Sequence, residues 1–140
     1  MGRRPRTIPM PTPATAADYA PPPEVAGDPD AHAAWTATVA ALEAVGTLHV
    51  ADRAAVTRYS LLTALHRRSM ARCLDGGTTD TARSGYTQIS PQFVVLMKTS
   101  RELAGLERQF GLTPASRESL KVRPRPVGEN PLARFLTVSG

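Results

Sequence analysis

The stretch FGLTPASR, Phe110 to Arg117, fixes where one helix of this chain ends and the next begins. A long segment with helical spacing of apolar residues leads up to Gly111, and glycine readily adopts the left-handed conformation that ends a helix. Thr113 and Pro114 then provide a cap and a first turn for a short helix that continues to Leu120. The stretch predicts a sharp corner between two helices, with Arg117 in the second one.

The same start and stop signals recur upstream and predict three longer helices. Each begins at a capping residue, two of them followed by proline, and each ends at glycine. The starts and ends are Asp28 and Gly46, Asp52 and Gly76, and Ser90 and Gly111. The second and third helices are similar in length, on the order of 35 Å for the second, so we expect them to pack as an antiparallel hairpin.

Apolar residues at steps of three and four predict the buried face of each helix. The first stripe is His32, Trp35, Val39 and Leu42. The second is Val56, Tyr59, Leu62, His66, Met70 and Cys73, widened by Leu61 and Leu65. The third is Phe93, Leu96, Leu103, Leu106 and Phe110, with Ser100 in the stripe. Gly105 lies inside the third helix at a cost of about 1 kcal/mol relative to alanine, so we expect a close helix crossing there.

Proline-rich segments flank the helices. Residues 1–27 hold seven of the 13 prolines and predict a disordered arm. Residues 122–140 form a second, basic arm with an apolar end at Leu132, Phe135 and Leu136, which is either a docking peptide or an end packed on its own domain. Residues 76–89 predict a loop with at most a short β-hairpin. The predicted fold is all-α, with one helical domain over residues 28–121.

The net charge of +5 is concentrated at the ends of the chain. Residues 1–27 and 28–113 each carry +1, and residues 114–140 carry +3. Basic arms on a nearly neutral body favour contact with a polyanion such as nucleic acid, although ordinary solubilising charge gives the same total.

The sequence offers no set of residues for catalysis, a metal or a cofactor. The three histidines lack zinc-helix spacing, and Cys73 is the single cysteine, which is typical of an intracellular protein. Asp75 and Asp80 lie in the Gly/Thr-rich connector, where capping or solvated roles are expected. No phosphate-binding loop or nucleophile elbow is present. No apolar run approaches the length of a membrane span, and no signal peptide is recognisable.

Several of these features resemble the small subunit of phage terminase, in the helical type of tailed phages and prophages. The resemblance covers roughly residues 30–121. It is carried by HAAWTATVAALEAVG with Trp35 and Gly46, by ADRAAVTRYSLL with Asp52 and Tyr59, by a connector that ends at Pro91, and by FGLTPASRESL.

The resemblance implies a non-catalytic protein of the host cytoplasm that acts in viral DNA packaging. Such subunits bind double-stranded viral DNA at the packaging site, and recruit and regulate the large subunit, which is the ATPase and nuclease. They form homo-oligomeric rings of around eight to twelve members. A separate helix-turn-helix domain is not recognisable before Asp28, so the DNA-contacting surface is not given by the resemblance.

Candidate surfaces follow from the positions of basic and apolar residues. We expect phosphate contacts, with little base discrimination, from nine basic side chains. These are Arg67, Arg68, Arg72, Lys98, Arg101, Arg117, Lys121, Arg123 and Arg125. Arg117 has the alternative of pairing with a carboxylate of its own or the next subunit. We expect Val94, Val95 and Met97 to be covered by a neighbouring subunit, because they lie beside the main stripe of their helix.

Two other functions stay open on the sequence alone. One is a small dimeric DNA-binding regulator, which requires a trihelical domain with a basic recognition helix. The other is a phage structural or adaptor protein that docks partners through its apolar tail.

Overall fold

The computed structural model describes residues 14–120, and this part of the chain is mostly helical. Its elements in order are η1 (Ala16–Asp18), α1 (Pro23–Ala26), α2 (Pro29–Ala44), η2 (Val50–Asp52), α3 (Arg53–Gly76), β1 (Thr79–Thr81), β2 (Thr87–Ile89), α4 (Pro91–Gln109) and α5 (Pro114–Ser119). The proposed C-terminal arm with its apolar end, and residues 1–13, lie outside the described residues.

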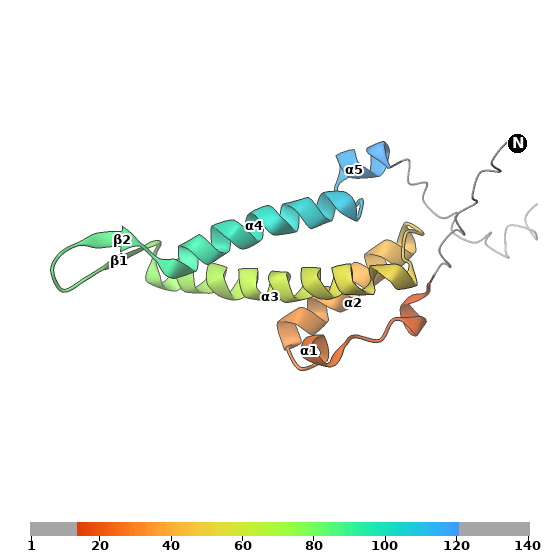
Figure 1. The fold of residues 1–140 in the computed structure, drawn as a ribbon, viewed down its shortest axis with the longest axis horizontal. Helices are drawn as coiled ribbons and strands as arrows, with labels where there is room; N and C mark the ends of the chain where they lie inside the picture. The colour runs from red at the N-terminus through yellow and green to blue at the C-terminus, as the bar shows by residue number, and fades with distance from the viewer. Residues whose placement is uncertain (1–13, 121–140) are drawn as a thin grey trace, which may run out of the picture.

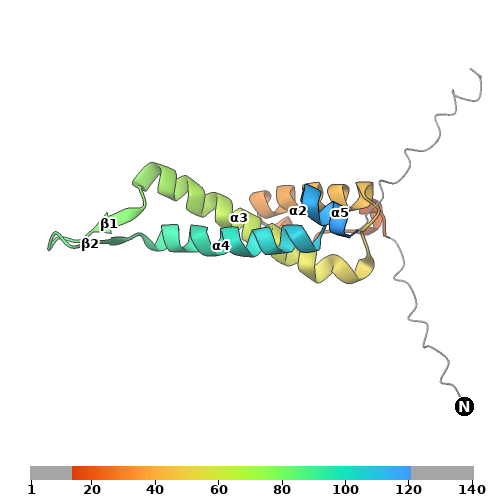
Figure 2. The same cartoon turned by 90° about the horizontal axis from the view of Figure 1, so that it is seen from above.

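The helices form three layers with α3 in the middle (Figure 1). The long helices α3 and α4 pack against each other as the predicted antiparallel hairpin, while α2 packs along the first half of α3 on the side away from α4. A small antiparallel strand pair joins α3 to α4, with Thr79 opposite Ile89. This strand pair extends beyond the helices at the end opposite to α5 (Figure 2).

The predicted helix ends are confirmed, because local capping chemistry produces them. The Asp28 carboxylate accepts hydrogen bonds from the backbone N–H groups of Asp30 and Ala31, at 3.1 and 3.2 Å. Ser90 caps α4 in the same way, and Thr113 caps α5. Gly111 has a φ of 70°, a left-handed conformation that favours glycine. Asp52 is different: its carboxylate accepts from the N–H of His49 in the turn η2 and does not cap α3.

The prediction of a disordered arm over residues 1–27 is wrong for residues 14–27, which fold onto α2. Tyr19 stacks on Trp35 with ring centroids 5.5 Å apart, and its hydroxyl donates to the carbonyl of His49 at 3.0 Å. Val25 is fully buried. Prolines exclude a long helix, but they do not prevent an extended segment from burying an aromatic ring and an aliphatic side chain on a neighbouring helix.

The core follows from this arrangement. It contains Trp35, Val39 and Leu42 of α2 together with Val56 of α3, as predicted. His32 of the predicted stripe is exposed instead, and Ala31, Ala34 and Thr38 share the buried face of α2.

The buried face of α3 differs from the predicted stripe. Leu61, Leu65 and Met70 are exposed, whereas small residues at Ser60, Ala64 and Ser69 are buried. The reason is that α3 is packed from two sides, by α2 and by α4, and small side chains let both helices approach it closely. A single apolar stripe describes a helix with one buried face, which α3 is not.

Two further expectations on α4 are wrong. Thr99 occupies the buried position and Ser100 is exposed. Within residues 14–120, no other helix crosses closely at Gly105, because a Cβ atom added there meets nothing within 4 Å.

Candidate functional surfaces

Charge is divided between the layers of the fold. Residues 14–52, which form α1, α2 and their connections, carry six acidic side chains and no lysine or arginine, a net charge of −6. Residues 53–120, which form α3, the strand pair, α4 and α5, carry ten basic and five acidic side chains, a net charge of +5. One outer layer is therefore acidic, and the remainder is basic.

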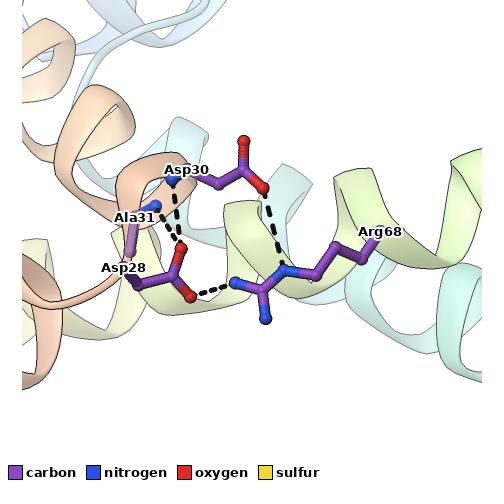
Figure 3. Close-up of polar contacts among 4 residues, drawn as sticks. All are labelled: Asp28, Asp30, Ala31 and Arg68. Carbon is purple, nitrogen blue, oxygen red and sulfur yellow. Dashed lines mark hydrogen bonds and ion pairs between the residues drawn. The ribbon is translucent and has the colours of Figure 1, made fainter.

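Arg68, a predicted DNA-binding residue, bridges the two parts (Figure 3). Its guanidinium contacts the Asp28 carboxylate and lies 3.7 Å from that of Asp30. Backbone hydrogen bonding from Ala31, followed by the Arg68 contact, holds the pKa of Asp28 below its usual value. Arg68 thus ties the start of α2 to the middle of α3, and two of its three guanidinium nitrogens already lie beside carboxylates.

The two other predicted arginines of α3 lie on different sides of the helix. Arg72 is exposed and lies one turn beyond Arg68, on the same face. Arg67 lines a shallow polar groove between α3 and α4. The structure therefore does not bring Arg67 and Arg72 together.

The groove beside Arg67 is held by hydrogen bonds between the two long helices. Nδ1 of His66 lies 3.2 Å from the hydroxyl of Thr99, so this half-buried histidine has the polar partner expected of a structural residue. The Tyr59 hydroxyl donates to Glu107 at 3.2 Å. Burial raises the pKa of Tyr59, and the negative charge of Glu107 raises it further. These contacts fix the register of α3 against α4.

Lys98 and Arg101 lie on the outer face of α4, in the same groove as two predicted interface residues. The groove has a volume of about 680 Å³ and is lined mainly by apolar side chains. Its lining residues are Ile89, Phe93, Val94, Met97, Lys98, Arg101 and Glu102. Val94 and Met97 are 40% and 55% exposed, so this part of the chain leaves them without cover. An apolar strip flanked by two cations and one carboxylate is a surface suited to a macromolecular partner.

The remaining predicted site residues have other positions. Val95 is half-buried and does not line the groove of Val94 and Met97. Arg117 donates to the carbonyl of Leu112 at 3.0 Å, and this bond closes the corner between α4 and α5. Lys121, Arg123 and Arg125 lie outside the described residues.

Two exposed arginines escaped the sequence analysis. Arg58 lies on α3, 14 residues or almost four turns before Arg72 and on nearly the same face. Arg108 lies on α4 seven residues after Arg101, on the same face. Helical spacing from the recognised residues was the signal that pointed to both. The acidic character of the α2 layer was also visible in the sequence. It was missed because the net charge was summed over residues 28–113, which combine the acidic α2 with the basic helices.

Within residues 14–120, no three His, Cys, Asp or Glu side chains gather as a metal site. None of the helices in that range is long and apolar enough to cross a membrane.

The fold and its surfaces define a three-layered helical protein with opposite charges on its outer layers and an open apolar groove. The family described as "Phage terminase, small subunit" matches residues 31–126. The chain belongs to the phage terminase small subunits, and this membership implies a role in phage DNA packaging. No curated protein and no solved structure shows significant similarity to the chain.

Proposed function

We propose that this protein is a non-catalytic terminase small subunit that binds double-stranded viral DNA at the packaging site, in the host cytoplasm. It recruits the large subunit and regulates its ATPase and nuclease. Membership of the small-subunit family supports the packaging role. The observation that carries DNA binding is the basic character of residues 53–120, with ten basic and five acidic side chains on α3, α4, α5 and their connections.

The basic side chains of α3 and of the C-terminal arm are the proposed phosphate contacts. Arg58 and Arg72 are exposed and 14 residues apart, which is about 21 Å along the helix. Arg67 is exposed on the other flank of α3. The predicted run Lys121, Arg123 and Arg125 follows α5 in the sequence and adds three basic side chains to the proposed contacts. Such contacts neutralise phosphates without reading bases, so affinity falls steeply with salt.

The other predicted contacts receive different roles. Arg68 is held by two aspartates, and Arg117 by a backbone carbonyl, so we give both a structural role. Lys98 and Arg101 flank exposed Val94 and Met97, and a contact with DNA phosphates leaves those apolar side chains in water. We therefore place Lys98 and Arg101 at a protein interface.

A homo-oligomeric ring of around eight to twelve copies is part of the proposal. Each copy supplies only a few phosphate contacts, and a ring multiplies them along one duplex, so that weak contacts add up to an appreciable affinity. The uncovered groove on α4 supports association between protein chains.

The alternative of a small dimeric regulator is less well supported. It requires a basic recognition helix within a trihelical domain. The α2 helix carries no lysine or arginine, and α5 has six residues. The other alternative is a structural or adaptor protein that binds no DNA. The following experiment distinguishes it from a DNA-binding small subunit.

DNA affinity of the full chain, measured against salt concentration, tests the proposal. We expect binding to a duplex with a negative slope of log affinity on log salt. The double variant Arg58→Ala/Arg72→Ala reduces both the affinity and the slope, whereas Arg83→Ala, an exposed arginine between the two strands, leaves both unchanged. Absence of duplex binding at low salt, with the assembled particle intact, contradicts the DNA-binding role and favours the adaptor.

A further inference from the structure

The two outer layers of the molecule are opposite in charge and lie on opposite sides of α3. The α2 layer, residues 14–52, has a net charge of −6, whereas α4 carries Lys98, Arg101 and Arg108 against Glu102 and Glu107, a net charge of +1. Both layers pack on α3, and neither covers the other's outer face. One copy therefore cannot satisfy both surfaces by itself, but two copies stacked in the same orientation can.

The outer face of α4 is the surface that needs cover. Val94, Met97 and Ile89 are 40%, 55% and 61% exposed along a groove that is mainly apolar. Its rim carries Lys98 and Arg101 against Glu102, a net positive charge, so a second α4 helix brings an excess of like charge and is a poorer occupant than an acidic face. The exposed flank of α3 is a poor occupant for the same reason, since it carries Arg58 and Arg72.

The outer face of α2 has the opposite properties. Its exposed positions are mainly alanines, at residues 33, 37, 40, 41 and 44. Glu43 on the same helix and Glu24 on α1 provide negative charge near this surface, and there is no lysine or arginine in the layer. The length of α2 is about 24 Å and that of α4 about 28 Å, so one helix can cover most of the other. Larger side chains of α4 can pack against these small ones while the acidic and basic groups pair at the rim.

We propose, on the basis of the ring put forward above, that copies join by placing the α2 layer of one subunit over the α4 groove of the next. The contact is heterologous, because each subunit contributes a different face. An open assembly then has a free α2 layer at one end and a free groove at the other, until it closes into a ring. The negative charge of the α2 layer and the cations of the groove favour this contact. They disfavour contact between two α2 layers or between two grooves.

Mixing two variants of the full chain tests this arrangement. The groove variant is Met97→Glu/Arg101→Glu, and the α2 variant is Ala37→Arg/Ala40→Arg. All four positions are exposed, so both variants should keep the helical content of the wild type. A hairpin variant, Arg83→Glu/Tyr86→Glu, changes two exposed residues of the connection between the strands and serves as the matched control.

Light scattering at tens of micromolar then separates the outcomes. Each variant alone should have the mass of a single 15.0 kDa chain, while the control assembles like the wild type. Mixed in equal amounts, the two variants should form a particle of at least two chains, because the intact α2 layer of one meets the intact groove of the other. The two substituted faces carry exchanged charges, so any growth beyond two chains also requires an α2 layer to meet a groove.

Three results overturn the inference. If the α2 variant alone still assembles, the groove is covered by something other than an α2 layer. If neither variant loses assembly, the groove is not part of the subunit contact, as when the C-terminal segment covers it. If both lose assembly but do not combine, the two faces do not meet. A wild-type protein that stays a single chain refutes the proposed ring itself, which is a separate result.

Discussion

The replacement Val25→Ala tests whether residues 14–27 belong to the folded domain. Val25 is fully buried against the cluster that contains Trp35, Leu42 and Val56. Removal of two methyl groups costs about 1.6 kcal/mol in transfer free energy, at about 0.8 kcal/mol per buried carbon. A void of roughly 40 Å³ adds about 1 kcal/mol, so we expect the free energy of unfolding to fall by about 2 to 3 kcal/mol.

Equilibrium urea unfolding, followed by circular dichroism, measures this loss. Protein concentration is held equal for all samples, because subunit association adds to apparent stability. The same substitution at an exposed site, Val50→Ala, is the matched control, since Val50 is 64% exposed, and its effect should stay within about 0.5 kcal/mol. A loss for Val25→Ala as small as that of Val50→Ala would show that the segment is not part of the core.

Three further substitutions have distinct expected outcomes. Within residues 14–120 the buried hydroxyl of Ser69 has no hydrogen-bond partner, so Ser69→Ala should raise the urea midpoint by the equivalent of about 1 kcal/mol. Ser60→Ala is its control, because the Ser60 hydroxyl donates to a backbone carbonyl. An equal fall of the urea midpoint in both variants would contradict the prediction. Gly105→Ala should raise the free energy of unfolding by about 0.5 to 1 kcal/mol, unless another copy approaches α4 there, in which case stability of the assembly falls. The pKa of Tyr59 is raised above 10.0 in the fold, so the stabilising contribution of Tyr59 is present below pH 10 and is lost as the pH rises above it. The stability of Tyr59→Phe should therefore fall less above pH 10 than that of the wild type. An equal fall in both proteins refutes this.

Helix boundaries were predictable because each is a local event. Asp28, Ser90 and Thr113 cap the N–H groups within three residues of themselves, and this chemistry is complete in the sequence. Gly111 requires only its own left-handed conformation. The antiparallel hairpin followed from two helices of similar length joined by a short connector.

Buried faces were harder to predict because they depend on how many neighbours a helix has. Leu61 and Leu65 extend the apolar stripe of α3 in the sequence, yet α2 and α4 take the faces that carry Ser60 and Ser69. Nothing within α3 alone specifies that two helices pack on it. For the same reason, Tyr19 and Val25 were assigned to a disordered arm, since their burial depends on Trp35 and its surroundings.

The candidate surfaces were partly predictable. Val94 and Met97 were correctly identified as apolar residues outside the main seam, and they remain uncovered in the fold. The involvement of Arg68 with Asp28 was not predictable, because these residues are 40 positions apart and meet only when α2 lies along α3. The negative charge of residues 14–52 was visible in the sequence, but their position as an outer layer on α3 depends on how the helices pack.

The mass of the wild-type particle in solution tests the central claim most directly, since both the pooled phosphate contacts and the pairing of unlike faces require association of many copies. Light scattering of the full chain at micromolar concentration should give about 120 to 180 kDa, which is eight to twelve chains of 15.0 kDa. A mass near 15 kDa at that concentration would contradict the account.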